Sequence, residues 1–174
     1  PGYAVSDFEL SLHDQAKGIR LSASDGLDRA SPLKFWNDLD KIAPPDRLVR
    51  HLLGTSTLAL VYGEPGCGKT FLVTDLGMHI AMGREWFGRP VTAGAVLYVA
   101  CEGVGGLVNR LAAFRNMWAT PPDVPFAVFA ATPDLGPGGE DAELIVNAAN
   151  DIKERTGQAV QLIIIDTLAR AMGI

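Results

Sequence analysis

The sequence predicts an α/β fold in which a mostly parallel sheet is flanked by helices on both faces. Four short apolar runs alternate with segments of helical periodicity between Ser56 and Ile165. The runs are apolar throughout, which is typical of strands that are buried on both faces of a parallel sheet. A glycine-rich loop joins the first run to the first helical segment, a connection that many phosphate-binding α/β proteins share.

The chain begins with a segment that shows little periodicity. Residues 1–30 mix Ser, Asp and Gly with scattered apolar residues, and we interpret them as an N-terminal arm with a short strand in SDFELSL. We interpret residues 31–174 as one domain, without internal repeats. The chain starts at Pro1 without Met, so we expect a partial or processed sequence. A sheet that ended with the last apolar run would expose an edge strand, so we expect further strands after Ile174 in the complete protein.

A helix is predicted directly after the arm. Ser31 followed by Pro32 is a helix-start signal, and the pair Pro44–Pro45 ends the segment. One apolar face would be formed by Phe35, Trp36 and Leu39. We expect Trp36 to pack onto the core, the alternative being contact with a nucleotide base.

The remaining elements alternate between strand and helix. The predicted strands are Ser56–Tyr62, Ala95–Cys101, Phe126–Ala131 and Val160–Ile165. The predicted helices are Lys69–Met82, Val104–Ala119 and Glu140–Thr156. The second of these helices carries an apolar stripe formed by Leu107, Leu111, Phe114 and Trp118. Gly157 is placed to cap the third helix.

Composition excludes several classes of protein. A length of 174 residues is sufficient for one domain with a substantial core, and 48% of the residues are hydrophobic. A net charge of −5 excludes a global basic field for DNA or acidic membranes, although a local basic groove stays possible. No apolar run is long enough to span a membrane and no signal peptide is visible, so we expect a cytoplasmic protein. Cys67 and Cys101 lack metal-ligand spacing and are interpreted as reduced thiols.

The loop GEPGCGKT matches the phosphate-binding pattern G-x-x-x-x-G-K-[ST] from Gly63 to Thr70. Its glycines allow successive N–H groups to point inward, and the following helix adds its N-terminal dipole. We expect Lys69 to reach the β- and γ-phosphates of ATP and the Thr70 hydroxyl to bind Mg²⁺. The expected nucleotide contacts are Gly63, Glu64, Pro65, Gly66, Cys67, Gly68, Lys69, Thr70 and Phe71. The alternative, a chance match in a turn, is disfavoured by the flanking strand and helix patterns.

Two acidic residues each follow an apolar run at the edge where parallel sheets bind ligands. Asp166 follows Leu162–Ile165, and we expect it to hold Mg²⁺ directly or through water, the alternative being a helix N-cap. Glu102 ends the run that begins at Val96. There it could accept a proton from the water that attacks the γ-phosphate, the alternative being a solvated acid at a strand end.

The motifs GEPGCGKT, YVACEG and IIIDTLAR, with WFGRPV between the first two, together resemble the RecA-like P-loop ATPase core. Within it they look most like the RepA-type hexameric replicative helicases of plasmids and phages, AAA-family ATPases. The resemblance spans Asp46–Ile174. It implies that Glu102 is the catalytic base, that Lys69 and Thr70 bind phosphate and Mg²⁺, and that Asp166 is the second acid.

The resemblance also implies partners and missing parts. It implies single-stranded DNA as a partner and a homo-oligomer in the form of a hexameric ring. Arg110 has a position similar to that of a family arginine near the nucleotide, and Arg170 could meet nucleotide or a neighbouring subunit; a surface salt bridge is the alternative for both. The arginine finger and DNA-facing loops would follow Ile174, so we expect this chain alone to hydrolyse ATP weakly or not at all.

We therefore expect Mg²⁺-dependent ATP binding and hydrolysis by a motor core, with a replicative DNA helicase as the whole protein. One alternative is a regulatory or DNA-binding module that ATP only switches. A second alternative is a phosphotransferase, against which the lack of clustered arginines between Phe71 and Arg170 argues. Replacing Glu102 by Gln separates the motor from the switch.

Overall fold

A computed structural model describes residues 35–39 and 46–174 of the chain. The contacts within it divide the chain into two compact units with their boundary between Leu60 and Val61, and each unit is described by itself. The strand expected in SDFELSL, the helix start at Ser31–Pro32 and the break at Pro44–Pro45 lie outside the described residues.

The first unit contains a short helix and a small hairpin. Helix α2 spans Trp36–Leu39, and strands β1 (Arg47–Val49) and β2 (Leu53–Gly54) pair antiparallel. Leu48 and Val49 are buried. The side chain of Trp36 is 84% exposed. A helix of one turn presents too few side chains to form an apolar face.

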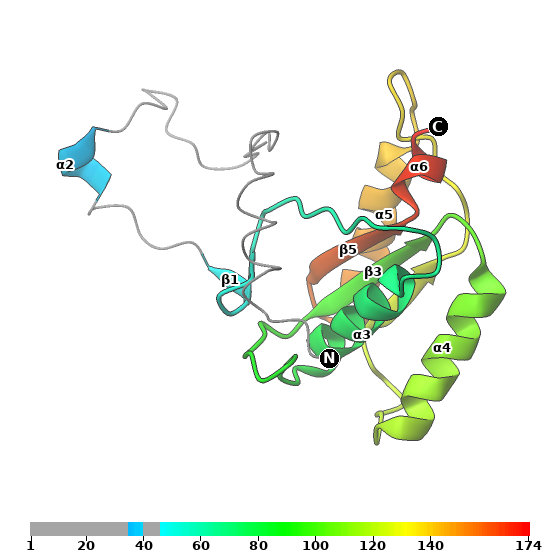
Figure 1. The fold of residues 1–174 in the computed structure, drawn as a ribbon, viewed down its shortest axis with the longest axis horizontal. Helices are drawn as coiled ribbons and strands as arrows, with labels where there is room; N and C mark the ends of the chain where they lie inside the picture. The colour runs from blue at the N-terminus through cyan, green and yellow to red at the C-terminus, as the bar shows by residue number, and fades with distance from the viewer. Residues whose placement is uncertain (1–34, 40–45) are drawn as a thin grey trace. The chain divides into compact units, whose positions relative to one another are not determined.

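The second unit is built on a three-stranded parallel sheet with the order β4-β3-β5 (Figure 1). Its strands are β3 (Ala95–Ala100), β4 (Phe126–Phe129) and β5 (Val160–Asp166). All six residues of the central strand β3 are buried. The register pairs Ala100 at the end of β3 with Asp166 at the end of β5. The carboxyl ends of these two strands therefore lie at the same edge of the sheet.

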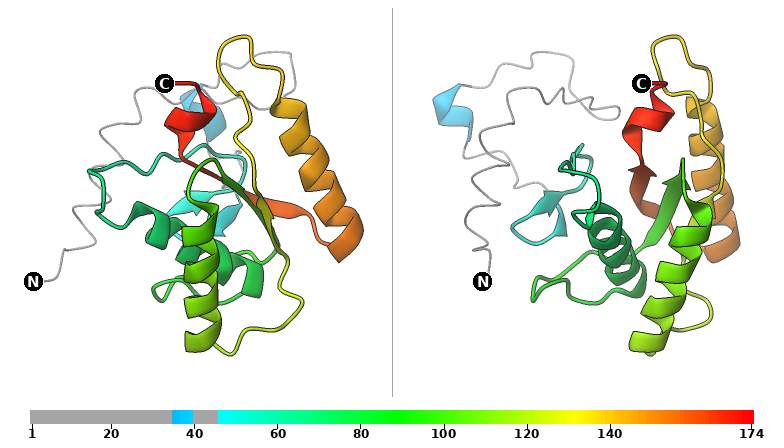
Figure 2. Two further views of the ribbon diagram at one scale, coloured as in Figure 1. Left: turned by 90° about the vertical axis from the view of Figure 1, so that its right-hand side faces the viewer. Right: turned by 45° about the vertical axis from the view of Figure 1, so that its right-hand side comes forward.

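Helices α3 (Lys69–Met82) and α4 (Val104–Met117) lie on one side of the sheet. Helix α3 lies against the sheet at Gly77, where an added Cβ would be 3.0 Å from Ile164 and 3.3 Å from Val96. Helix α4 packs on α3, with Phe114 and Trp118 against the ring of His79. The left-hand view of Figure 2 shows this pair of helices on one side of the sheet and α5 on the other.

Helix α5 (Ala142–Thr156) covers the opposite face. Ile145 and Ile152 of α5 form a core cluster with Ala95, Leu97 and Val99, which are the odd-numbered residues of β3. Successive side chains of a strand point to opposite faces, so the even-numbered residues of β3 face α3. A last short helix, α6 (Leu168–Ala171), follows β5. Helices on both faces of a parallel sheet confirm the predicted fold class.

Several predicted boundaries agree closely with the structure. Helix α3 has the predicted bounds, and Gly157 ends α5 in the left-handed conformation with its N–H bonded to the Lys153 carbonyl. Helix α5 begins at Ala142 rather than Glu140 because a hydrogen-bonded loop precedes it, in which the Asp134 N–H bonds to the Asp141 carboxylate. Helix α4 ends two residues early, at Met117, and β4 ends at Phe129. Of the apolar stripe on α4, Leu107 and Phe114 are buried and Trp118 is partly exposed.

The predicted strand Ser56–Tyr62 is wrong. Residues 57–62 are not part of any strand in the structure, and the side chains of Leu58 and Tyr62 are 77% and 57% exposed. A strand forms only where its backbone N–H and C=O groups find a partner strand. Apolar composition indicates a tendency toward burial but does not supply that partner.

Within the described ranges 35–39 and 46–174, no helix is both long and apolar enough to cross a membrane.

Candidate functional site

The loop that precedes α3 has the backbone of a phosphate cradle. Gly66 and Gly68 have φ angles of 79° and 96°, which side-chain-bearing residues rarely adopt. No atom lies within 4 Å of the Cβ that either residue would carry, so the backbone angle, not space, requires glycine here. Gly68 is the N-cap of α3, and no side chain caps the helix start. The N–H groups of the first turn are therefore available to an anion.

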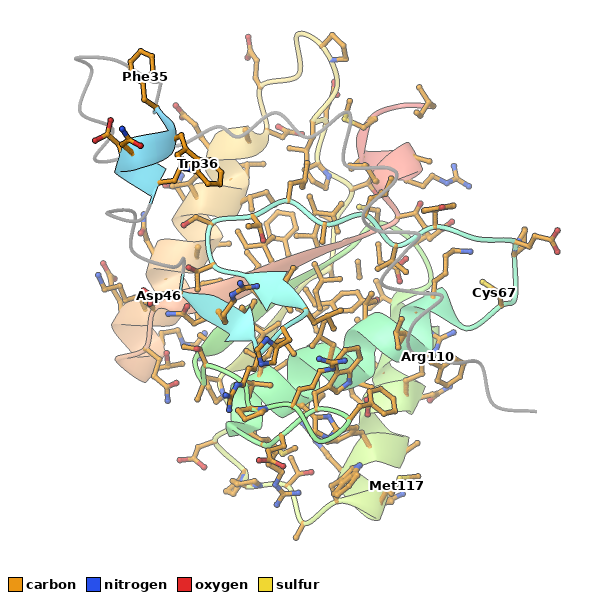
Figure 3. All side chains as sticks on the ribbon, turned by 60° about the vertical axis from the view of Figure 1, so that its left-hand side comes forward. Phe35, Trp36, Asp46, Cys67, Arg110 and Met117 are labelled. Carbon is orange, nitrogen blue, oxygen red and sulfur yellow. The ribbon has the colours of Figure 1, made fainter. Side chains whose placement is uncertain are left out.

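Lys69 places its charge inside this loop. Its Nζ donates hydrogen bonds to the carbonyl oxygens of Gly63, at 2.8 Å, and Glu64, at 2.9 Å. The same Nζ lies 3.9 Å from the Sγ of Cys67, which is an exposed residue of the loop (Figure 3). The loop thus wraps around its own ammonium group, the group that a bound triphosphate would meet.

Three oxygen-bearing side chains from three elements meet at the end of β5. The Thr70 hydroxyl in the first turn of α3 donates to Oδ2 of Asp166 at 2.9 Å, across 96 residues of sequence. The Tyr98 hydroxyl in β3 donates to the same Oδ2 at 2.6 Å. The Thr74 hydroxyl, one turn along α3, donates to the Thr70 carbonyl at 2.6 Å. The fold therefore brings together the two residues that the sequence predicts as Mg²⁺ ligands.

Tyr98 is a member of this cluster that sequence reasoning missed. It lies in the middle of the buried run AVLYVA, where its polar hydroxyl is the exception. A buried tyrosine hydroxyl usually needs a hydrogen-bond partner, and this is the signal that could have singled it out. Burial raises the pKa of Tyr98 far above its ordinary value, and the hydrogen bond to Asp166 and its charge add to this effect. Tyr98 is consequently a hydrogen-bond donor at neutral pH.

Glu102 lies at the same edge of the sheet, on the bend that follows β3. The preceding residue, Cys101, donates its N–H to the Asp166 carbonyl at 2.8 Å, which ties the two strand ends together. The Glu102 carboxylate is half exposed and lies 3.5 Å from Nε of Arg170, which belongs to α6. Burial, followed by the charges of Asp166 and Glu102, raises the pKa of the Cys101 thiol.

Arg110 lies beside the start of α3. Its guanidinium carbon is 4.7 Å from the centre of the Phe71 ring, and Figure 3 shows Arg110 near that helix end. Its Nε is buried and has no hydrogen-bond partner among the described residues. The Phe71 ring, which the sequence places at the nucleotide, thus stacks on an arginine in this structure.

The Thr70–Asp166 pair fits the chemistry of Mg²⁺. A hydroxyl and a carboxylate supply the hard oxygen ligands that Mg²⁺ prefers, and the ion usually takes its other ligands from phosphates and water. Within the described part of the chain, no group of three or more His, Cys, Asp or Glu side chains forms a metal site. A metal at Thr70 and Asp166 would therefore take its remaining ligands from nucleotide phosphates and water.

Comparison with known proteins gives the family. The sequence model described as the AAA domain matches residues 25–174, which include the loop, β3, β5 and their acidic ends. No curated protein and no solved structure matched the chain. A match over most of the chain, together with the phosphate loop at the start of α3, shows that this chain belongs to the AAA domain family of P-loop ATPases.

Proposed function

We propose that this chain is the core of a RecA/RepA-like motor that binds and hydrolyses ATP with Mg²⁺, and that the complete protein is a replicative DNA helicase of the cytoplasm. The observation that carries the proposal is the 2.9 Å hydrogen bond from the Thr70 hydroxyl to the Asp166 carboxylate. Thr70 directly follows Lys69, whose ammonium group lies in the phosphate loop. Family membership supports the ATPase in general. The helicase part rests on the sequence resemblance.

The loop and the strand ends supply residues with distinct proposed roles. The N–H groups of Gly66, Gly68 and the first turn of α3 bind phosphate oxygens, and Lys69 neutralises the β- and γ-phosphates. Thr70 and Asp166 hold Mg²⁺. When bound, Mg²⁺ would draw charge from the β- and γ-phosphate oxygens.

Glu102 is the proposed general base. It would accept a proton from water as the water oxygen bonds to the γ-phosphorus and the bond to the β–γ bridging oxygen breaks, which releases ADP and phosphate. Its present contact with Arg170, at 3.5 Å, joins two well-exposed side chains and is therefore weak. We propose that Glu102 exchanges this contact for the attacking water when nucleotide binds.

The partners belong to the proposal as well. By resemblance to the related helicases, the complete protein forms a homo-oligomeric, hexameric ring and moves along single-stranded DNA. A neighbouring subunit would then supply an arginine to the nucleotide, which is worth several orders of magnitude in rate where it is used.

The test is ATP turnover with and without single-stranded DNA, measured on this chain and on any longer form that its gene encodes. Glu102→Gln should abolish turnover and leave the binding of a fluorescent ATP analogue unchanged, because the amide cannot accept the proton. Glu143→Gln is the matched control, since Glu143 is an exposed acid in the first turn of α5. It should leave both turnover and binding unchanged.

The outcomes separate the candidate functions. Turnover that DNA stimulates and that E102Q loses would support the motor. Turnover that ignores DNA would remove the helicase assignment and keep the ATPase. Nucleotide binding without any turnover, in a longer form as well as in this chain, would favour a module that ATP only switches.

A further inference from the structure

We propose that Tyr98 is a positioning residue for the Mg²⁺–ATP site: its hydroxyl fixes the Asp166 carboxylate so that the second carboxylate oxygen faces the metal. This inference rests on the proposed function, since it assumes that Thr70 and Asp166 hold Mg²⁺. Tyr98 itself touches neither nucleotide nor metal in the proposal and acts only through Asp166.

Tyr98 is buried, whereas Thr70 and Asp166 are partly exposed. Its side chain is 1% exposed, and it lies in the central strand with neighbours on both sides, Val128 of β4 and Ile164 of β5. Its ring lies 6.1 Å from that of Phe126, measured between centroids. A rigid ring in a close-packed interior places its hydroxyl with little freedom.

The register of the sheet directs that hydroxyl to Asp166. Tyr98 is paired with Ile164, and residue 166 lies two positions further along β5, on the same face as residue 164. The phenol therefore spans from one strand to the last residue of its neighbour, where the oxygen–oxygen distance is 2.6 Å. A bond of this length between a hydroxyl and a carboxylate is of the short, charge-assisted kind.

The two hydroxyl groups that bond to Asp166 share one of its carboxylate oxygens. Tyr98 and Thr70 both donate to Oδ2 of Asp166, and these are its side-chain hydrogen bonds within the described part of the chain. Two hydrogen bonds to one oxygen fix the rotation of the carboxylate, because the carboxylate plane can turn only if both break. Oδ1 then remains as the oxygen for an ion or its water. If Thr70 turned its hydroxyl to the metal, Tyr98 would be the donor left to hold the carboxylate.

The simpler alternative is that Tyr98 only joins β3 to β5 and stabilises the sheet. The two roles predict different effects on the dependence of nucleotide binding on Mg²⁺ concentration. A stabilising residue affects the unfolding of the protein but not the Mg²⁺ concentration that supports nucleotide binding. Loss of a positioning residue raises that Mg²⁺ concentration, because mutation of a group that hydrogen-bonds to a metal ligand typically weakens metal affinity about 10–100-fold.

The experiment measures binding of a fluorescent ATP analogue as Mg²⁺ is titrated. Tyr98→Phe removes the hydroxyl and keeps the ring, and it should raise the Mg²⁺ midpoint about 10-fold while leaving binding in EDTA unchanged. Val96→Ala is the control for lost packing. Val96 lies on the same face of β3 as Tyr98, but its side chain packs beside Gly77 of α3 and carries no group that could hydrogen-bond to Asp166. It should leave the Mg²⁺ midpoint unchanged.

A double-mutant cycle with Asp166→Asn tests the route of the effect. In the D166N background, Y98F should cause no further shift, because the carboxylate that Tyr98 positions is already gone. A further 10-fold shift in that background would overturn the proposal, as would an unshifted midpoint in Y98F alone. If the unaltered protein binds the analogue equally with and without Mg²⁺, the proposed Mg²⁺ site itself is refuted.

A second measurement on the unaltered protein does not depend on the folding of a variant. The hydroxyl proton of Tyr98 is shielded from solvent and strongly hydrogen-bonded, so it should give an exchange-protected NMR resonance. Its chemical shift should change when Mg²⁺ is added to protein that already holds the ATP analogue. A resonance that stays in place while Mg²⁺ binds would overturn the proposal.

Discussion

Gly77 offers a sharp test of how α3, which carries Lys69 and Thr70, is held against the sheet. Replacing Gly77 by Ala would place a methyl carbon 3.0 Å from Ile164, 3.1 Å from Phe126 and 3.3 Å from Val96. These distances are shorter by roughly 0.2–0.5 Å than the ~3.5 Å at which carbon atoms attract one another. The three neighbours are side-chain atoms from all three strands, so either all three side chains shift or α3 moves away from the sheet.

The expected loss of stability follows from two opposing effects. Overpacking a buried core costs about 1–3 kcal/mol, whereas Ala in place of Gly in a helix gains up to about 1 kcal/mol. We expect Gly77→Ala to lower the free energy of unfolding by about 1 kcal/mol. Gly105→Ala in α4 is the matched control, because no atom lies within 4 Å of its Cβ position. That variant should be more stable than the unaltered protein by up to about 1 kcal/mol.

Urea unfolding followed by circular dichroism measures both variants, with the midpoint compared at constant slope. The same displacement of α3 should lengthen the Thr70–Asp166 contact and weaken Mg²⁺-dependent nucleotide binding in Gly77→Ala, but not in Gly105→Ala. A Gly77→Ala protein that is as stable as Gly105→Ala would refute the reasoning, because it would mean that α3 does not need the close approach.

Two further predictions concern side chains of the site. The pKa of Tyr98 is raised in the folded protein, so as pH increases this tyrosine loses its proton in the unfolded chain first. The stability that the protonated, buried hydroxyl contributes is therefore complete below the ordinary tyrosine pKa of about 10. Above that pH it falls by up to about 1.4 kcal/mol per pH unit. Urea titrations from pH 9 to 11 should show this loss, and Tyr98→Phe should lack it; equal slopes would contradict the burial of that hydroxyl. Alkylation of Cys67, which is exposed 3.9 Å from the Lys69 ammonium, should block ATP binding because the adduct fills the loop, whereas buried Cys101 should react slowly. Mass spectrometry with a nucleotide-binding assay checks this, and normal affinity in the alkylated protein would show that the Cys67 side chain points away from the phosphates.

The sequence alone determined the features that depend on neighbours along the chain. The bounds of α3 follow from a glycine-rich loop before it and Gly83 after it, both of which set backbone angles locally. The Gly157 cap and the three strands of the sheet also depend on local sequence. A helix cap and a continuous apolar run are each recognised from a few consecutive residues. The α/β class, the phosphate loop and the acidic strand ends were accessible for this reason.

Only the tertiary structure decided which distant side chains meet. The bond of Tyr98 to Asp166 crosses 68 residues, and it exists because β3 and β5 are neighbours in a specific register. The contact of Glu102 with Arg170 and the stacking of Arg110 on Phe71 likewise join separate elements. Residues 57–62 show the converse case, since an apolar run becomes a strand only when a partner strand supplies its hydrogen bonds. Composition reports what each residue prefers, whereas pairing between strands decides which residues are brought within reach of one another.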